Sequence, residues 1–79
     1  MAVQLNGKKL HQERKRKAYT LAELAERCGT SERYVGDLER GRKSNPSAAM
    51  LYRFSRALGV PMEEFMLETA PDEEETAFF

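Results

Sequence analysis

The segment 21–38, LAELAERCGTSERYVGDL, constrains the fold of this chain more than any other part of it. Its apolar residues recur at helical intervals on both sides of a glycine, at Leu24, Ala25 and Cys28 and then at Val35 and Leu38. Gly29 adopts a left-handed backbone conformation more easily than other residues, so it can end the first helix and turn the chain. The pattern therefore predicts two short helices joined by a tight turn.

Two short helices with such a connection form a helix-turn-helix, whose second helix can enter the major groove of DNA. The distribution of charge also favours a polyanionic partner. All 13 Lys and Arg residues lie within 1–59, together with six acidic residues, whereas 60–79 hold seven acidic residues and no basic one. A basic body of this kind suits a polyanion, even though the net charge of the whole chain is zero. Together with the helix-turn-helix pattern it makes double-stranded DNA the expected partner.

Length and composition limit the class of protein. A chain of 79 residues forms one small domain, and its modest core favours dimerisation as a further source of stability. No apolar run approaches the roughly 20 residues that cross a bilayer, and the start lacks a signal peptide, so we expect a cytoplasmic protein without a membrane partner. With one Cys and one His, the sequence offers no disulfide and no metal site, and we expect no cofactor.

Caps, glycines and apolar stripes predict an all-α fold and show no strand-like alternation. The five helices are expected at about 6–16, 21–28, 31–40, 46–58 and 61–66, with Thr20, Thr30 or Ser31, and Asn45 as caps of the second, third and fourth. Pro46 is the expected first residue of the fourth helix. The inward residues expected for the fourth helix are Ala48, Leu51, Phe54 and Leu58. Residues 1–68 thus form the predicted helix-turn-helix domain, and 69–79 form an acidic, mobile tail.

In their order and spacing these elements resemble the Cro/repressor-type helix-turn-helix family of bacteria and phages. The resemblance extends from about Gly7 to Phe65 and is carried by Arg14, LAELA, CGTS, LERG, Asn45-Pro46 and ALGVPMEEF. It implies a compact five-helix, lambda-repressor-like domain, usually dimeric, that regulates transcription at the bacterial or phage nucleoid. It also implies a shielded ion pair between Arg14 and Glu39 that joins the first helix to the third.

The third helix is predicted to read DNA bases with the face that lies opposite Val35 and Leu38. The expected base-reading residues are Glu32, Arg33, Tyr34, Gly36 and Asp37. Arg33 can donate two hydrogen bonds to guanine, and the carboxylates of Glu32 and Asp37 can accept one from cytosine. Arg33 and Asp37 are also spaced to form an ion pair in the free protein.

Cations and polar residues around this helix predict contacts with the phosphate backbone, which hold register without reading sequence. The expected phosphate contacts are Lys15, Arg16, Lys17, Thr20, Arg40, Arg42, Lys43 and Ser44. Leu21 departs from the family pattern, which commonly has a phosphate-binding Gln at this position.

The predicted fifth helix carries more apolar surface than one short helix needs, which favours a homodimer. The expected dimer contacts are Met62, Phe65 and Met66. A two-fold dimer would hold its recognition helices roughly 34 Å apart and would read an inverted repeat. The tail 69–79 could dock on a protein partner or compete with phosphate for the basic face.

The predicted function is that of a sequence-specific transcriptional regulator, with repression as the expected action. An enzyme is not expected, because the sequence has no nucleophile–base pair, phosphate-binding glycine loop or metal-ligand cluster. The alternative is a protein-interaction module, such as an antitoxin or controller partner, that retains the fold. Leu21, Glu32, Asp37 and the acidic terminus favour this alternative, whereas the cations at 40–43 favour DNA.

Overall fold

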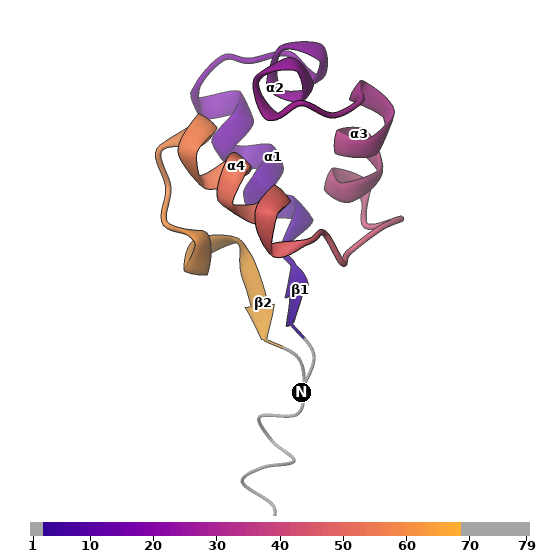
Figure 1. The fold of residues 1–79 in the computed structure, drawn as a ribbon, viewed down its shortest axis with the longest axis vertical. Coiled ribbons are helices and arrows are strands. Elements are labelled where there is room, and N and C mark those ends of the chain that lie inside the picture. Colours follow the sequence, from indigo (N-terminus) through magenta and orange to yellow (C-terminus); the bar gives the residue numbers. More distant parts are fainter. Residues whose placement is uncertain (1–2, 69–79) are drawn as a thin grey trace, which may run out of the picture.

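The computed structural model describes residues 3–68, and four α-helices form the body of this part (Figure 1). The helices are α1 (Gly7–Arg16), α2 (Leu21–Cys28), α3 (Glu32–Arg40) and α4 (Ala48–Leu58). The elements outside the α-helices are β1 (Val3–Leu5), the 3-10 helix η1 (Met62–Phe65) and β2 (Met66–Glu68). The helical character of the predicted fold is confirmed, whereas the predicted number of five helices is not.

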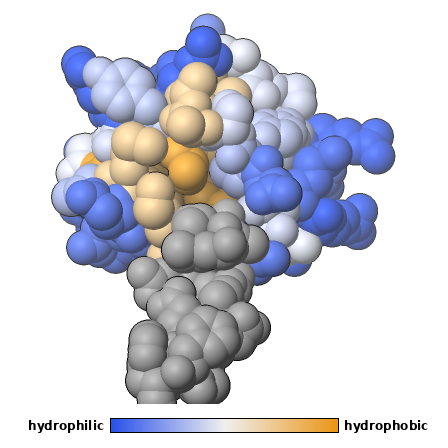
Figure 2. Space-filling view, turned by 60° about the horizontal axis from the view of Figure 1, so that its bottom comes forward, coloured by the Kyte–Doolittle hydropathy of each residue, from blue (hydrophilic) through white to orange (hydrophobic). Residues whose placement is uncertain are grey.

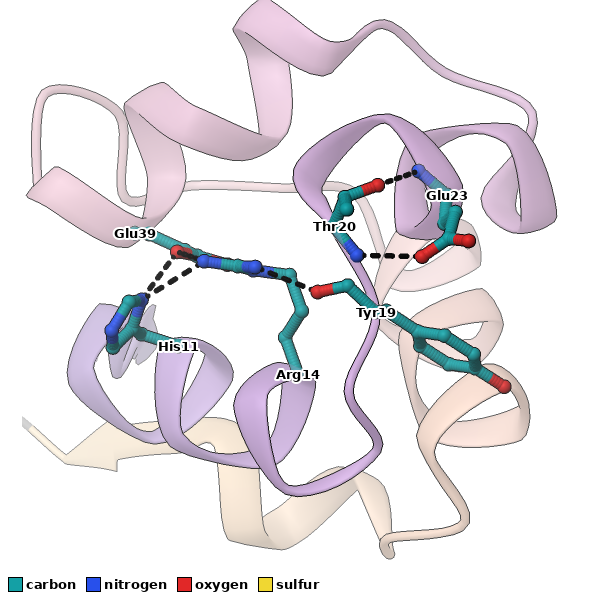
Figure 3. Close-up of polar contacts among 6 residues, drawn as sticks. All are labelled: His11, Arg14, Tyr19, Thr20, Glu23 and Glu39. Atoms are coloured by element: carbon teal, nitrogen blue, oxygen red, sulfur yellow. Dashed lines mark hydrogen bonds and ion pairs between the residues drawn. The ribbon is translucent and has the colours of Figure 1, made fainter.

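Each α-helix begins after a polar residue whose side chain accepts a backbone hydrogen bond from the first turn. These caps are Asn6, Thr20, Ser31 and Ser47. Thr20 forms a complete capping box, because its backbone N donates to Glu23 Oε1 at 2.8 Å while Glu23 N donates to Thr20 Oγ1 at 3.0 Å (Figure 3). The start of α2 is therefore fixed by the local sequence.

The predicted beginning of α4 at Asn45 and Pro46 was wrong. Ser47 is the cap, and its hydroxyl accepts a hydrogen bond from the backbone N of Met50 at 3.1 Å. The helix therefore starts two residues later than expected. Ala48, predicted to face inward, is exposed because it is the first residue of the helix.

The helices enclose a single core to which all four contribute. Helix α3 packs against α1 and α2, α2 also packs against α4, and η1 packs against α1 and α4. The predicted inward residues of α2 and α3 are at most 3% exposed: Leu24, Ala25, Cys28, Val35 and Leu38. Gly29 ends α2 in the left-handed conformation, with φ of 69°. The predicted helix-turn-helix, with its glycine turn and inward residues, is confirmed.

Cys28 is a buried core residue, as its helical position predicts. Burial raises the pKa of its thiol to about 11, although the charge of nearby Arg53 acts in the opposite direction. The thiol is therefore neutral at physiological pH and packs as a small apolar group.

The predicted short fifth helix is a 3-10 helix rather than an α-helix, and the predicted absence of strands was wrong. After the short 3-10 helix the chain extends into β2, which pairs antiparallel with β1 and aligns Leu5 with Met66. Asn6 N also donates to Phe65 O at 2.7 Å, next to this sheet. Each strand has three residues, too few to show alternation, and the pairing joins segments about 60 residues apart.

Two further expectations concern the acidic tail and the spanning of a membrane. The acidic tail at 69–79, together with its predicted partner contacts, lies outside the described residues. Within residues 3–68, no helix combines the length and the apolar character that spanning a membrane requires.

Gly7 permits the close approach of α1 to the end of α3, which yields a stability prediction. A Cβ at Gly7 would collide with the Leu38 carbonyl oxygen and lie 2.9 Å from that of Glu39. We expect Gly7→Ala to lower the free energy of unfolding by about 2 kcal/mol, because backbone atoms must shift. Urea denaturation measures this change.

Gly36→Ala is the matched control, because a Cβ there would meet only the flexible end of Arg40 among its nearest neighbours. It should raise the free energy of unfolding by up to about 1 kcal/mol through higher helix propensity. Equal effects of the two substitutions would contradict the proposed role of Gly7.

Candidate nucleic-acid interface

Helix α3 lies at one edge of the molecule, with one side packed on α1 and α2 (Figure 1). Its N-terminal residues Glu32 and Arg33 are exposed, and Tyr34 is partly buried against the core. The helix therefore presents a free edge that begins with a carboxylate and a guanidinium.

A hollow of about 450 Å³ lies between α1, the start of α2 and α3. Its lining residues are Lys8, His11, Gln12, Arg14, Leu21, Gly36, Glu39 and Arg40. A shallower recess adjoins it, lined by Leu21, Glu32, Arg33, Gly36 and Arg40. Leu21, Gly36 and Arg40 line both, so the two recesses are neighbours, and we call them together the α3 groove.

Gly36 and Asp37 line recesses of this surface but are buried, at variance with the expected exposed positions. The guanidinium of Arg40 covers Gly36. The chain after α3 turns back over Asp37, whose carbonyl oxygen accepts hydrogen bonds from the backbone N atoms of Arg42 and Lys43 at 2.9 and 3.3 Å. These backbone bonds close the C-terminal end of α3 and hold residues 42 and 43 near Asp37.

The predicted ion pair between Arg33 and Asp37 is absent among the ion pairs of residues 3–68. Arg33 is exposed, whereas Asp37 is 7% exposed. The free protein therefore leaves the guanidinium of Arg33 available to other acceptors.

An ion pair between Arg14 and Glu39 joins α1 to the C-terminal end of α3 (Figure 3). Arg14 Nε donates to Glu39 Oε2 at 2.7 Å and Nη2 donates to Oε1 at 3.1 Å. A third donor of the same guanidinium, Nη1, reaches the carbonyl oxygen of Tyr19 at 2.8 Å. The side chains of Arg14 and Glu39 are 9% and 7% exposed, so the pair is shielded from solvent.

His11 completes this cluster and was missed as a functional residue by the sequence interpretation. Its Nδ1 lies 2.7 Å from Glu39 Oε1, and since an ionised carboxylate only accepts, His11 donates this bond. Burial acts to raise the pKa of Glu39, but the hydrogen bonds from Arg14 and His11 outweigh it and hold the pKa below its usual value of 4.5. The signal was the spacing of three residues between His11 and Arg14 on one helix face.

The expected phosphate contacts fall into two groups. Thr20 caps α2 next to Leu21, and exposed Arg40 lines the α3 groove, whereas Arg42, Lys43 and Ser44 lie in the loop after α3. Lys8, His11 and Gln12 also line this groove, although the sequence interpretation did not select them. With Lys15, which is exposed, they follow the spacing of one α1 face, and this periodicity was the signal available.

Arg16 and Lys17 belong to other parts of the surface. Arg16 Nη2 lies 2.6 Å from Glu13 Oε1. Lys9 Nζ lies 3.2 Å from Glu13 Oε2 and 3.4 Å from Oε1 of Glu64, a residue of η1. The side chain of Lys17 extends toward Gly59 at the end of α4. Internal pairing thus uses Arg16, a cation that the sequence alone assigned to phosphate.

The hydrogen bonds from Arg16 and from Lys9 hold the pKa of Glu13 below its usual value, although burial acts to raise it. The bond to Glu13 in turn raises the pKa of Lys9. These three residues remain charged at neutral pH and form a network on the η1 side of α1.

Phe65, one of the expected dimer contacts, is fully buried in the core of the protomer and cannot face a partner. Met62 and Met66 are partly buried and pack against that core. Figure 2 shows apolar side chains at the surface on the end of the molecule that carries the sheet. Within residues 3–68, no group of three His, Cys, Asp or Glu side chains could hold a metal ion.

Residues 10–65 match the family described as helix-turn-helix, and the chain belongs to this family. It is 38% identical over 62 residues to the HTH-type transcriptional regulator SinR of Bacillus licheniformis, covering 78% of this chain and 56% of that protein. It is 41% identical over 56 residues to the HTH-type regulator y4dJ of Sinorhizobium fredii, covering 71% of each. The chain thus spans just over half the length of the SinR relatives.

Solved structures of regulators share the fold. The structure of SinR in complex with DNA has a TM-score of 0.70 and 38% identity, covering 73% of this chain and 95% of that one. The SinR–SinI complex has a TM-score of 0.73 and 32% identity, covering 91% and 74%. The P22 c2 repressor on a synthetic operator has a TM-score of 0.70 and 27% identity, covering 76% and 89%. The sequence relatives are named as regulators rather than enzymes.

The shielded pair predicts a specific dependence of stability on pH. Glu39→Gln should lower the free energy of unfolding by about 3 kcal/mol at neutral pH, because the Arg14 charge stays buried without its partner. The folded-state pKa of Glu39 lies below its usual 4.5, so the contribution is present above that value and is lost as pH falls through the folded-state pKa. The difference between variant and unsubstituted protein should therefore shrink in acid.

Urea denaturation across the acid range measures this difference. Glu26→Gln, at an exposed position of α2, serves as the control and should differ little from the unsubstituted protein at any pH. A Glu39→Gln difference that stays constant through the acid range would contradict the assigned role of the carboxylate.

Proposed function

We propose that this chain is a sequence-specific DNA-binding transcriptional regulator, acting as a repressor and without catalytic activity. The observation that carries the proposal is the exposed edge of α3, where Arg33 adjoins a groove and the cations Arg40, Arg42 and Lys43 follow. A 38% identical relative with the same fold is solved in complex with DNA, which supports this function. The alternative of a protein-interaction module that has lost DNA binding is not favoured by these relatives.

In this proposal α3 enters the major groove with its N-terminal half toward the base edges. Arg33 grips guanine O6 and N7 with two donors, and Glu32 accepts from cytosine N4. Tyr34 and Asp37 lie beside them, and the recess that they share with Arg33 is also lined by Lys43. Reading by Asp37 requires the side chain of Lys43 to leave this recess for a phosphate.

Phosphate contacts hold α3 in register. The proposed set is Lys15, Thr20, Arg40, Arg42, Lys43 and Ser44. Thr20 keeps its hydroxyl proton available for a phosphate, because its oxygen only accepts in the cap. Arg16 and Lys17 are assigned only flanking contacts, since Arg16 pairs with Glu13 and Lys17 lies near Gly59.

A homodimer is proposed to present two α3 helices to an inverted repeat. Residues 1–68 form the DNA-binding domain, and the acidic residues 69–79 are proposed to contact a protein partner. Met62 and Met66 supply apolar contacts of the dimer, since both are partly exposed at the end where the sheet lies. Such a dimer would hold its recognition helices roughly 34 Å apart, about one turn of DNA.

The test of DNA reading compares Arg33→Ala with Arg42→Ala. Selection from random duplex DNA should enrich an inverted repeat, and Arg33→Ala should relax preference at one base pair per half-site by about 1–3 kcal/mol. Arg42→Ala should weaken binding to all duplexes alike and reduce the slope of log K against log salt by about one.

Melting temperatures of both variants provide the control for folding. Absence of any enriched sequence at low salt would overturn the assignment as an operator reader. Equal, sequence-independent losses for both variants would remove base reading from Arg33.

The dimer proposal predicts that Met66→Lys shifts the chain toward monomer, because a charge would enter an apolar contact. Sedimentation velocity measures the association state. Ala49→Lys, at an exposed position of α4, should leave it unchanged. A monomeric unsubstituted protein that binds a single half-site would contradict the dimer.

A further inference from the structure

We propose that Leu21 and Gly36 form an apolar subsite for the 5-methyl group of a thymine in the bound duplex. The inference rests on the proposed function and deepens it, because it names a base that the α3 groove recognises. Leu21 belongs to the start of α2 and Gly36 to the middle of α3, and they line the same recess. Two helices therefore contribute to one small site.

The chemistry of the recess identifies the group that it fits. Its other lining residues, Glu32, Arg33 and Arg40, are charged and suit polar base edges or phosphates. Leu21 can donate and accept no side-chain hydrogen bond, and Gly36 has no side chain. On the major-groove edges of the base pairs, the thymine methyl is the apolar group, and apolar side chains recognise it.

Gly36 provides the space for this methyl group. A Cβ built there would lie 3.0 Å from Arg40 Nη1 and 3.6 Å from two further guanidinium atoms, and these are its three nearest neighbours. The cover over Gly36 is thus the flexible end of a side chain. Movement of Arg40 to a phosphate uncovers the backbone, and a larger residue at 36 would fill the space that remains.

Leu21 is only partly buried, although it packs against the core. Its remaining surface faces the α3 groove, since it lines both recesses. Gly36 follows Arg33 by three residues, or about 5 Å along the helix. With base pairs 3.4 Å apart, the thymine should lie within about two base pairs of the guanine that Arg33 reads.

Replacing thymine by deoxyuridine in the duplex tests the subsite, because this change removes only the methyl group. The full chain first selects its preferred duplex from a random pool. Each thymine of that duplex is then replaced in turn, and the dissociation constant is measured. We expect one thymine per half-site whose replacement weakens binding about four-fold, the value for one buried methyl-sized group.

Variants of the two residues locate the effect in the protein. Gly36→Ala fills the cleft and Leu21→Gln removes its apolar wall, so both should abolish the difference between thymine and deoxyuridine at that position. Leu21→Met, which conserves volume and apolar character, should retain it. Because Leu21→Gln could lose stability, Gly36→Ala gives a second result from a variant that favours the helix.

The outcomes separate this subsite from the proposed function. A selected duplex that binds with equal affinity after every thymine replacement overturns the subsite and leaves the regulator assignment standing. A methyl effect that persists in Gly36→Ala and Leu21→Gln places the methyl contact elsewhere and also overturns it. Failure to select any duplex overturns the subsite together with the function on which it rests.

Discussion

The shielded pair between Arg14 and Glu39 is the interaction on which the arrangement of α1, α3 and the α1–α2 connection depends. One guanidinium donates to the carboxylate at the end of α3 and to the Tyr19 carbonyl oxygen in the α1–α2 connection. A buried charge without its partner costs several kcal/mol, so the three segments must keep this relative position. The same carboxylate receives a bond from His11, which places a titratable side chain at the rim of the α3 groove.

The distribution of ion pairs, rather than the number of cations, defines the candidate interface. On the η1 side of α1, Lys9 and Arg16 pair with Glu13 and Glu64. Within residues 3–68, no ion pair involves the cations of α3 or of the loop that follows it. Positive charge around α3 is thus left for an external anion, which agrees with the DNA-bound structures of related regulators.

The α3 groove combines this charge with the apolar side chain of Leu21. Leu21 reaches it from the start of α2, where the capping box at Thr20 fixes the helix and therefore the position of the side chain. The close approach of α1 at Gly7 and the ion pair at Arg14 hold the opposite wall. Specificity in this domain would then depend on shape and hydrophobicity as well as on hydrogen bonding.

The sequence by itself determined α2, α3 and the turn between them, because caps, a glycine and helical periodicity act within a few residues. Tertiary structure alone decided the pairing of β1 with β2, since three-residue strands about 60 residues apart carry no local signal. It also decided that Lys9 pairs with Glu64 and that His11 reaches Glu39, since these partners lie far apart in the chain. A helical pattern gives the direction of a side chain, but what lies over that side chain comes from segments distant in the chain.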